Sequence, residues 1–186
     1  MKKVLITLLA LGNSVGAVEV GLKLGWAQVS VNRENLDFDT IASLYLNVGV
    51  VSTPLFEAGP QINLAHAERT LFSDICYNLP LTRCDYDFTY TSFELNGYGK
   101  LGLGMFRIYG GAGVSLNRFR LEVKEADTGE VVYVPASETY GGYQFFGGVQ
   151  LSFGAVGVGG EFKYKRFNSE EFTDMRVASL FVSYSF

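Results

Sequence analysis

The sequence predicts an all-β protein, an eight-stranded antiparallel up-and-down transmembrane β-barrel. Three observations predict this fold: an export signal at the start, strict period-two alternation in the rest, and an aromatic residue at the last position. The composition agrees, because 22 Gly, 15 Phe and 11 Tyr stand beside only 4 Pro and 1 His. Glycine and aromatic residues alternating in short runs are typical of strands rather than helices.

The chain begins with a secretory signal. Two lysines precede an apolar run over 4–11, and small residues then end at Ala17 in the form of a cleavage site. The run is too short to cross a bilayer as a helix, and no later segment has the roughly 20 consecutive apolar residues that a transmembrane helix needs. We therefore expect a signal peptide at 1–17 and one barrel domain at 18–186.

The charge balance argues against nucleic acid as a partner. Removal of the signal takes two of the 15 basic residues, which leaves 13 basic against 19 acidic residues and a formal charge of −6. Nucleic-acid binding needs a basic surface that neutralises phosphates.

Eight segments alternate apolar and polar side chains. In order they cover 18–26, 44–50, 56–64, 93–103, 106–116, 143–153, 156–164 and 178–186. The alternation slips near Ala27, where we expect a bulge or the membrane border. Pro60 does not fit the third segment as a regular strand, because proline cannot donate a hydrogen bond to a strand ladder.

The connections between these segments differ in length in a regular way. Three are tight, around 52–54, 102–105 and 154–155, whereas four are long and polar, near 32–40, 66–90, 118–140 and 166–175. Outer-membrane barrels have short periplasmic turns and long extracellular loops. We therefore expect both chain termini in the periplasm.

The polar face of the predicted strands carries all of their charges. The four acids are Glu19, Glu57, Glu94 and Glu161, and the four bases are Lys23, Lys100, Arg107 and Lys163. The apolar face ends in two aromatic girdles, one of Phe56, Phe106, Phe153 and Phe186 and the other of Trp26, Phe93, Tyr143 and Tyr164. Such girdles are typical of a wall that faces lipid. A water-soluble barrel with the charges outside is the alternative.

With the charges inside, the lumen of an eight-stranded barrel is only just wide enough for its side chains. An unpaired charge there would be costly, so the charges should pair. Glu19, Glu57, Lys100 and Arg107 lie toward the periplasm, and Lys23, Glu94, Glu161 and Lys163 lie higher. Each layer has two charges of each sign, which predicts a neutral polar plug rather than a catalytic carboxylate pair.

Cys76 and Cys84 lie close together in a polar stretch, and in an exported protein a disulfide is their expected state. Two cysteines without a nearby histidine make a poor metal site. We expect no metal and no cofactor.

Acidic residues of the long connections form a solvated surface or, alternatively, bridge divalent cations to lipopolysaccharide. Examples are Glu34, Asp37, Asp39, Asp74, Asp85, Asp87, Glu170 and Glu171.

The C-terminal alternation Leu180, Val182, Tyr184 and Phe186 resembles the closing signature of bacterial outer-membrane barrels. This resemblance implies recognition by the barrel-insertion machinery and a bacterial outer-membrane location. With the signal and the glycine-rich aromatic strands, the mature chain resembles the small eight-stranded family that includes OmpX, the opacity proteins and the membrane domain of OmpA.

Small barrels of this kind also include lipid A deacylases, which have an outward His-x-Ser. Here His66 is followed two residues later by Glu68, and no nucleophile lies beside it, so we expect no catalytic residues and no enzyme. The sequence favours a monomeric structural or surface-interaction barrel in contact with outer-membrane lipid and lipopolysaccharide, with an extracellular ligand bound through its loops. A narrow pore is the alternative, and a lipid-modifying enzyme is less favoured.

Overall fold

The computed structural model describes residues 17–31, 34–53, 55–73, 84–125 and 131–186. Its strands are β1 (Val18–Val31), β2 (Glu34–Val48), β3 (Val51–Ser52), β4 (Phe56–Ser73), β5 (Cys84–Leu103), β6 (Phe106–Glu125), β7 (Val131–Phe153), β8 (Val156–Phe167) and β9 (Phe172–Ser185). No helix among these residues is long and apolar enough to cross a membrane.

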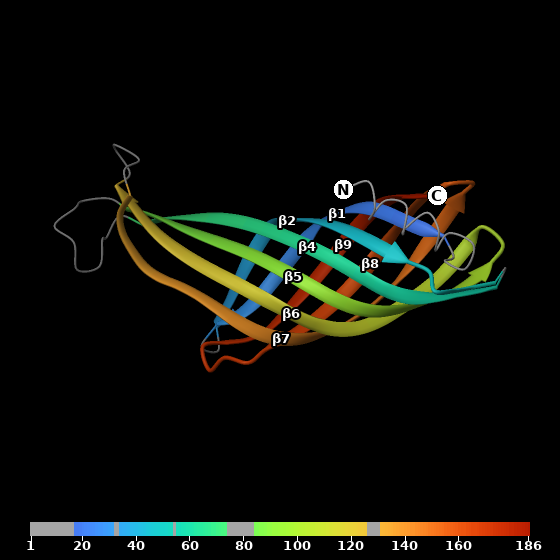
Figure 1. The fold of residues 1–186 in the computed structure, drawn as a ribbon. Coiled ribbons are helices and arrows are strands. Elements are labelled where there is room, and N and C mark those ends of the chain that lie inside the picture. Colours follow the sequence, from blue (N-terminus) through green and yellow to red (C-terminus); the bar gives the residue numbers. More distant parts are fainter. Residues whose placement is uncertain (1–16, 32–33, 54, 74–83, 126–130) are drawn as a thin grey trace, which may run out of the picture.

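The strands form one closed antiparallel sheet (Figure 1). Strands that are neighbours in the sequence pair with each other, except β2 and β3, which both pair with β4; β1 also pairs with β9. β2 and β3 therefore act as one strand of an eight-stranded barrel, as predicted. The interruption between them explains Pro60, which lies opposite it: Gln61 pairs with Asn47 and Ala58 with Val51, so the ladder already lacks regular pairs at Pro60.

The alternation of the sequence becomes the two faces of the wall. Leu22, Leu64 and Leu95 are exposed on the outside, whereas their strand neighbours Lys23, Asn63 and Glu94 are buried in the lumen. The residues predicted for the girdles and the C-terminal signature all face outward. The outer wall is thus a continuous apolar surface, which is the surface that a lipid bilayer requires of a barrel.

The irregularity expected near Ala27 is present, but the extra residue belongs to β2. Gly25 pairs with Ile41 and Ala27 with Phe38, so β2 advances by three residues while β1 advances by two. The parity of β1 does not slip: Ala27 and Val29 stay on the inner face and are buried. Ala27 and Val29 are apolar because, at this height, apolar rather than polar side chains fill the lumen.

The prediction of long loops at 66–90 and 118–140 was wrong. Most of these residues lie in strands, because β4 and β5 pair from Phe56–Leu101 to Ser73–Cys84, and β6 and β7 also pair far beyond the membrane wall. Figure 1 shows β4–β7 reaching past the ends of β1, β2, β8 and β9. We call this extension the arm. In the arm the alternation continues but is reversed: Phe119 and Val123 of β6 are inward and buried, whereas the charged side chains between them face outward. A pattern of apolar residues on the outward face therefore ends where the arm begins.

Candidate functional site

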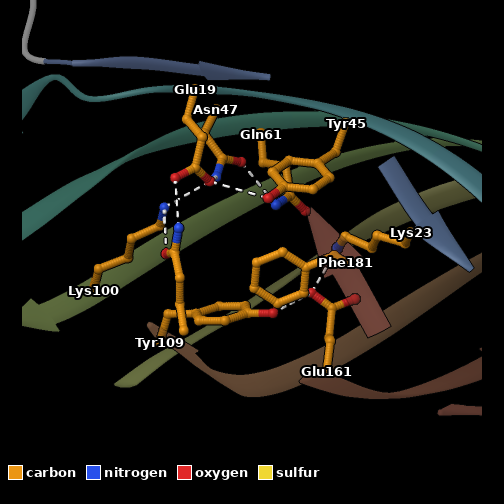
Figure 2. A pocket seen from close by; sticks show the side chains of 10 residues that line it. Glu19, Lys23, Tyr45, Asn47, Gln61, Lys100, Tyr109, Glu161 and Phe181 are labelled. Carbon is orange, nitrogen blue, oxygen red and sulfur yellow. Dashed lines mark hydrogen bonds and ion pairs between the residues drawn. The ribbon is translucent and has the colours of Figure 1, made fainter. Parts of the chain in front are cut away.

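The lumen on the side of the tight turns is organised around Glu19, a fully buried carboxylate (Figure 2). Lys100 Nζ donates to its Oε1 at 2.8 Å, and the Gln150 amide donates to its Oε2 at 3.0 Å. The Tyr45 hydroxyl and the Asn47 amide donate to Oε1 at 3.1 and 3.0 Å. This carboxylate is therefore surrounded by donors from β2, β5 and β7.

Above Glu19, five charged side chains alternate in sign up the lumen. Lys23 Nζ lies 2.6 Å from Glu161 Oε2, and Lys163 Nζ lies 3.8 Å from the other oxygen of Glu161. Lys163 also lies 2.7 Å from Glu94, whose second oxygen is 2.6 Å from Lys165 Nζ. We call Lys23–Glu161–Lys163–Glu94–Lys165 the charge ladder. All five side chains are buried, so each charge depends on its neighbours in the ladder.

Arg107 and Glu57 lie apart from this ladder, at the mouth near the tight turns. Arg107 Nη1 is 4.0 Å from Glu57 Oε2, and the arginine side chain is 32% exposed. Glu57 also accepts a hydrogen bond of 2.6 Å from the Tyr98 hydroxyl. Water can reach this pair, so it contributes less than the buried pairs above it.

Lys165 is the lumen residue that sequence analysis missed, and it corrects the prediction of a neutral plug. Its ammonium is fully buried and donates to Tyr90 Oη and Ser92 Oγ, both at 2.8 Å. With it, the lumen holds five bases and four acids. The signal was present in the sequence, because Lys165 continues the inward parity of Glu161 and Lys163, but the strand was predicted to end at Tyr164.

An apolar cluster fills the lumen beyond Lys165, toward the arm. Its centre is Phe119, whose ring stacks on Phe172 with centroids 4.1 Å apart and meets Phe167 edge-on at 5.3 Å. We call this cluster the outer seal. Its buried members are Ala27, Val29, Phe38, Ile41, Ala65, Ala67, Tyr90, Phe119, Phe167, Met175 and Val177. The polar lumen is thus covered by hydrocarbon on its outer side.

Aromatic rings also fill the lumen beside the charges, and glycines make room for them. A Cβ on Gly111 would lie 2.4 Å from the Phe146 ring, and one on Gly159 would lie 2.5 Å from the Phe181 ring. Between the rings and the ion pairs, the cavity lined by Glu19, Lys23 and Glu161 has a volume of only about 10 Å³. That is space for about one water molecule.

The remaining predicted residues divide by location. Cys76, and with it the predicted disulfide to Cys84, lies outside the described residues, as do residues 1–16 of the predicted signal peptide. Leu180, Val182, Tyr184 and Phe186 lie on the outer wall of β9 and at its end, where Phe186 N–H donates to Val18 O at 2.8 Å. The first and last strands therefore meet at the end with the tight turns, as the sequence predicted.

His66 is exposed on the outer wall of β4, where its ring nitrogens contact Thr91 Oγ1 at 3.2 Å and Glu68 Oε1 at 3.1 Å. Within the described part of the chain, no three His, Cys, Asp or Glu side chains gather in a way that could hold a metal ion.

The arm carries its own ion pairs on its outward face. Lys124 Nζ lies 2.6 Å from Asp87 Oδ2, and Arg120 pairs with Glu122. Partial burial alone would raise the pKa of Asp87, but hydrogen bonds from Lys124 and Thr70 outweigh it and hold that pKa below its usual value. The hydrogen bond and charge of Asp87 raise the pKa of Lys124 in return. A cavity of about 330 Å³ lies over these residues.

Comparison with known proteins gives matches in structure and not in sequence. No protein-family model matches the chain, and no curated protein matches it. The crystal structure of Neisserial surface protein A aligns with 92% of this chain and 99% of its own, with a TM-score of 0.66 and 16% identity. This chain has the fold of the small outer-membrane β-barrels. The predicted resemblance is thereby confirmed at the level of the fold, which is one of bacterial outer membranes.

Two further barrels support the same fold. Ail of Yersinia pestis, solved in complex with the heparin analogue sucrose octasulfate, aligns over 91% of this chain and 99% of its own, with a TM-score of 0.59 and 14% identity. A major outer membrane protein of Thermus thermophilus aligns over 90% and 99%, with a TM-score of 0.59 and 11% identity. At these identities the likeness establishes the fold alone.

Proposed function

We propose that this chain is a monomeric outer-membrane barrel with a sealed lumen that binds an extracellular partner through its arm. The observation that carries the proposal is the arm itself, a four-stranded sheet that projects beyond the membrane wall. The pairing of β2 with β4 stops at Ile41–Ala67, and the pairing of β7 with β8 stops at Gly142–Phe167. Beyond these points the described residues pair β4 only with β5, and β7 only with β6.

The arm therefore has two free sheet edges in the extracellular space. A free edge presents unpaired N–H and C=O groups, which another chain can use by adding a strand. On β4 the carbonyls of Phe56 and Ala58 point toward β3. Because pairing with β5 is unbroken from Phe56 to Ser73, residues of the same parity, including Thr70, direct their backbone groups toward the free edge.

The contents of the lumen support a binding role over conduction. Ion pairs and rings fill its middle, and the outer seal covers the side toward the arm. A water path would have to cross hydrocarbon and break buried ion pairs, both of which are costly. We therefore expect the refolded protein to show no sustained single-channel conductance in planar bilayers. Steady ohmic conductance would favour the narrow pore instead.

A substitution at the free edge tests the arm. Refolded protein in nanodiscs is applied to a panel of immobilised extracellular-matrix and serum proteins, and Thr70→Pro is compared with Thr70→Ala. Both lose the Thr70 hydroxyl that hydrogen-bonds Asp87, but only proline removes the backbone donor at the edge. We expect Thr70→Pro alone to weaken binding, by about tenfold for one backbone hydrogen bond and its neighbours.

Two results would count against the strand-addition mode. Equal binding by both variants would show that the edge is not used. Binding that is unchanged by Thr70→Pro but blocked by sucrose octasulfate would instead indicate recognition of sulfated carbohydrate, the kind of ligand present in the Ail complex.

A further inference from the structure

A ring of polar side chains surrounds the barrel just above its apolar outer wall, on the side of the arm. On each of the eight wall strands it is the first outward polar side chain beyond the apolar band. We call these residues the outer border ring: Gln28, Thr40, His66, Thr91, Arg118, Thr139, Arg166 and Arg176. The ring holds three arginines and no carboxylate, in a chain whose formal charge is −4. Two carboxylates adjoin the ring, because Asp37 pairs with Gln28 and Asp174 pairs with Arg166 in their ladders.

The opposite border of the wall is different. The described residues of its three tight turns carry no charged side chain, and Leu55, Leu103, Met105 and Phe153 are exposed there. Basic residues that only anchor a barrel by reaching into water would serve both borders equally. The arginines therefore indicate a binding partner that is present at the outer border of the wall and absent from the inner border.

The arginines are also available for a ligand. The Arg166 side chain is exposed and has no ion pair or hydrogen bond with the residues that the structure describes. Arg176 is 58% exposed and reaches Asp174 only at 3.9 Å. Arg118 donates to the Ser137 hydroxyl at 3.0 and 3.2 Å, a neutral partner that leaves its charge uncompensated.

Two of these arginines lie close enough to share one anion. Arg166 pairs with Asp174 across β8 and β9, and Arg176 pairs with Tyr164 in the same ladder. Arg166 and Arg176 are therefore diagonal neighbours on the outer face, with Cα atoms about 7–8 Å apart. Aromatic side chains of the girdle lie beside them, because Tyr143 pairs with Arg166 and Tyr164 pairs with Arg176.

We propose that the outer border ring binds the phosphate groups of lipid A, the phosphorylated glycolipid of the outer leaflet. Arg166 and Arg176 form the core of the site, and Arg118 makes a further contact. Guanidinium groups match phosphate oxygens in paired, charge-assisted hydrogen bonds, and the site lies at the height where headgroup phosphates meet the wall. The contact is direct and needs no divalent cation. It uses the barrel wall, so it is independent of the partner proposed for the arm.

The single tryptophan provides a probe for this site. Trp26 lies on the outer wall of β1, two residues below Gln28, which pairs with Arg176. Refolded protein in detergent micelles with EDTA is titrated with bisphosphorylated lipid A and with fully dephosphorylated lipid A, and Trp26 fluorescence is recorded. We expect binding of the phosphorylated form at least tenfold tighter, and no fluorescence change with inorganic phosphate alone.

A matched pair of double variants separates the ring from charge in general. Arg166→Gln/Arg176→Gln removes two ring charges, and Arg120→Gln/Lys124→Gln removes two outward charges from the arm. We expect about tenfold weaker binding of bisphosphorylated lipid A by the first double variant and unchanged binding by the second. A heat-modifiable gel shift checks that both are folded.

Several results would overturn the proposal. Equal weakening of binding by both double variants would mean non-specific attraction. If the wild-type protein bound dephosphorylated lipid A as tightly as the phosphorylated form, phosphate recognition would be excluded. Binding that appears only when Mg²⁺ replaces EDTA would assign the contact to a cation bridge. Saturation by inorganic phosphate would assign the site to the free anion rather than to the lipid.

Discussion

Replacing Glu94 by glutamine should lower the free energy of unfolding of the barrel more than replacing Arg107 by glutamine. Glu94 is fully buried and is the partner of two buried lysines, at 2.7 Å from Lys163 and 2.6 Å from Lys165. In Glu94→Gln, Lys163 keeps only Glu161 at 3.8 Å, and Lys165 keeps only neutral partners. Leaving a buried charge without its counter-charge costs about 3–5 kcal/mol.

The comparison is Arg107→Gln, which breaks the pair at the mouth. That pair spans 4.0 Å and its arginine is 32% exposed, so the loss should be below about 1 kcal/mol. The assay is urea unfolding of refolded protein, followed by the heat-modifiable gel shift. If the two variants lost similar amounts of stability, the interior charges would not be held by the pairing described above.

A double variant tests the excess base directly. Lys165→Met removes the fifth base of the lumen, so the cost of Glu94→Gln should be smaller in that background. Contacting residues in one network show coupling of about 0.5–3 kcal/mol. Strict additivity would mean that Glu94 and Lys165 do not stabilise each other.

Two further predictions concern packing and pH. Gly111→Ala should cost about 1–3 kcal/mol, because its Cβ would meet the Phe146 ring at 2.4 Å, whereas Gly97→Ala, with nothing within 4 Å, should be neutral or stabilising; urea midpoints measure both. In the arm, the lowered pKa of Asp87 means that its pairing with Lys124 stabilises fully above the ordinary carboxyl pKa of about 4 and is lost as pH falls through the lower folded value. The protection factors of amides in β5 and β6, which correct for the intrinsic pH dependence of exchange, should therefore be unchanged from pH 7 to 5 and fall below pH 4; an onset near pH 6 would contradict this sign.

The sequence predicted the membrane-spanning part of the fold because lipid imposes a rule on every residue there. A strand between hydrocarbon and a polar lumen must alternate, so Leu95 and Glu94 could be assigned to opposite faces from parity alone. Proline at position 60 looked like an error of this rule, and the structure shows instead a local break in the ladder.

The rule fails where its physical cause ends. In the arm the outward face is polar and the inward face apolar, as Asp87 and Thr89 on either side of Phe88 show. This is the reverse of the lipid-facing pattern, so these strands were taken for loops. Inside the lumen, the outer seal was missed because Val29 and Val177 are apolar on the inner face, which the pattern assigned to polar residues. Which charges pair also depends on the stagger of strands around the barrel, which parity does not contain.

The position of Glu19 has a consequence for the order of folding. Its donors include side chains 81, 131 and 166 residues away along the chain, Lys100, Gln150 and Ser185. Contacts between residues this far apart in the sequence form late in folding, because closing the chain loses entropy before the contacts can stabilise it. Glu19 loses its water only when β9 pairs with β1, so an open sheet keeps this carboxylate hydrated, and the final strand completes the closure and the charged interior in one step.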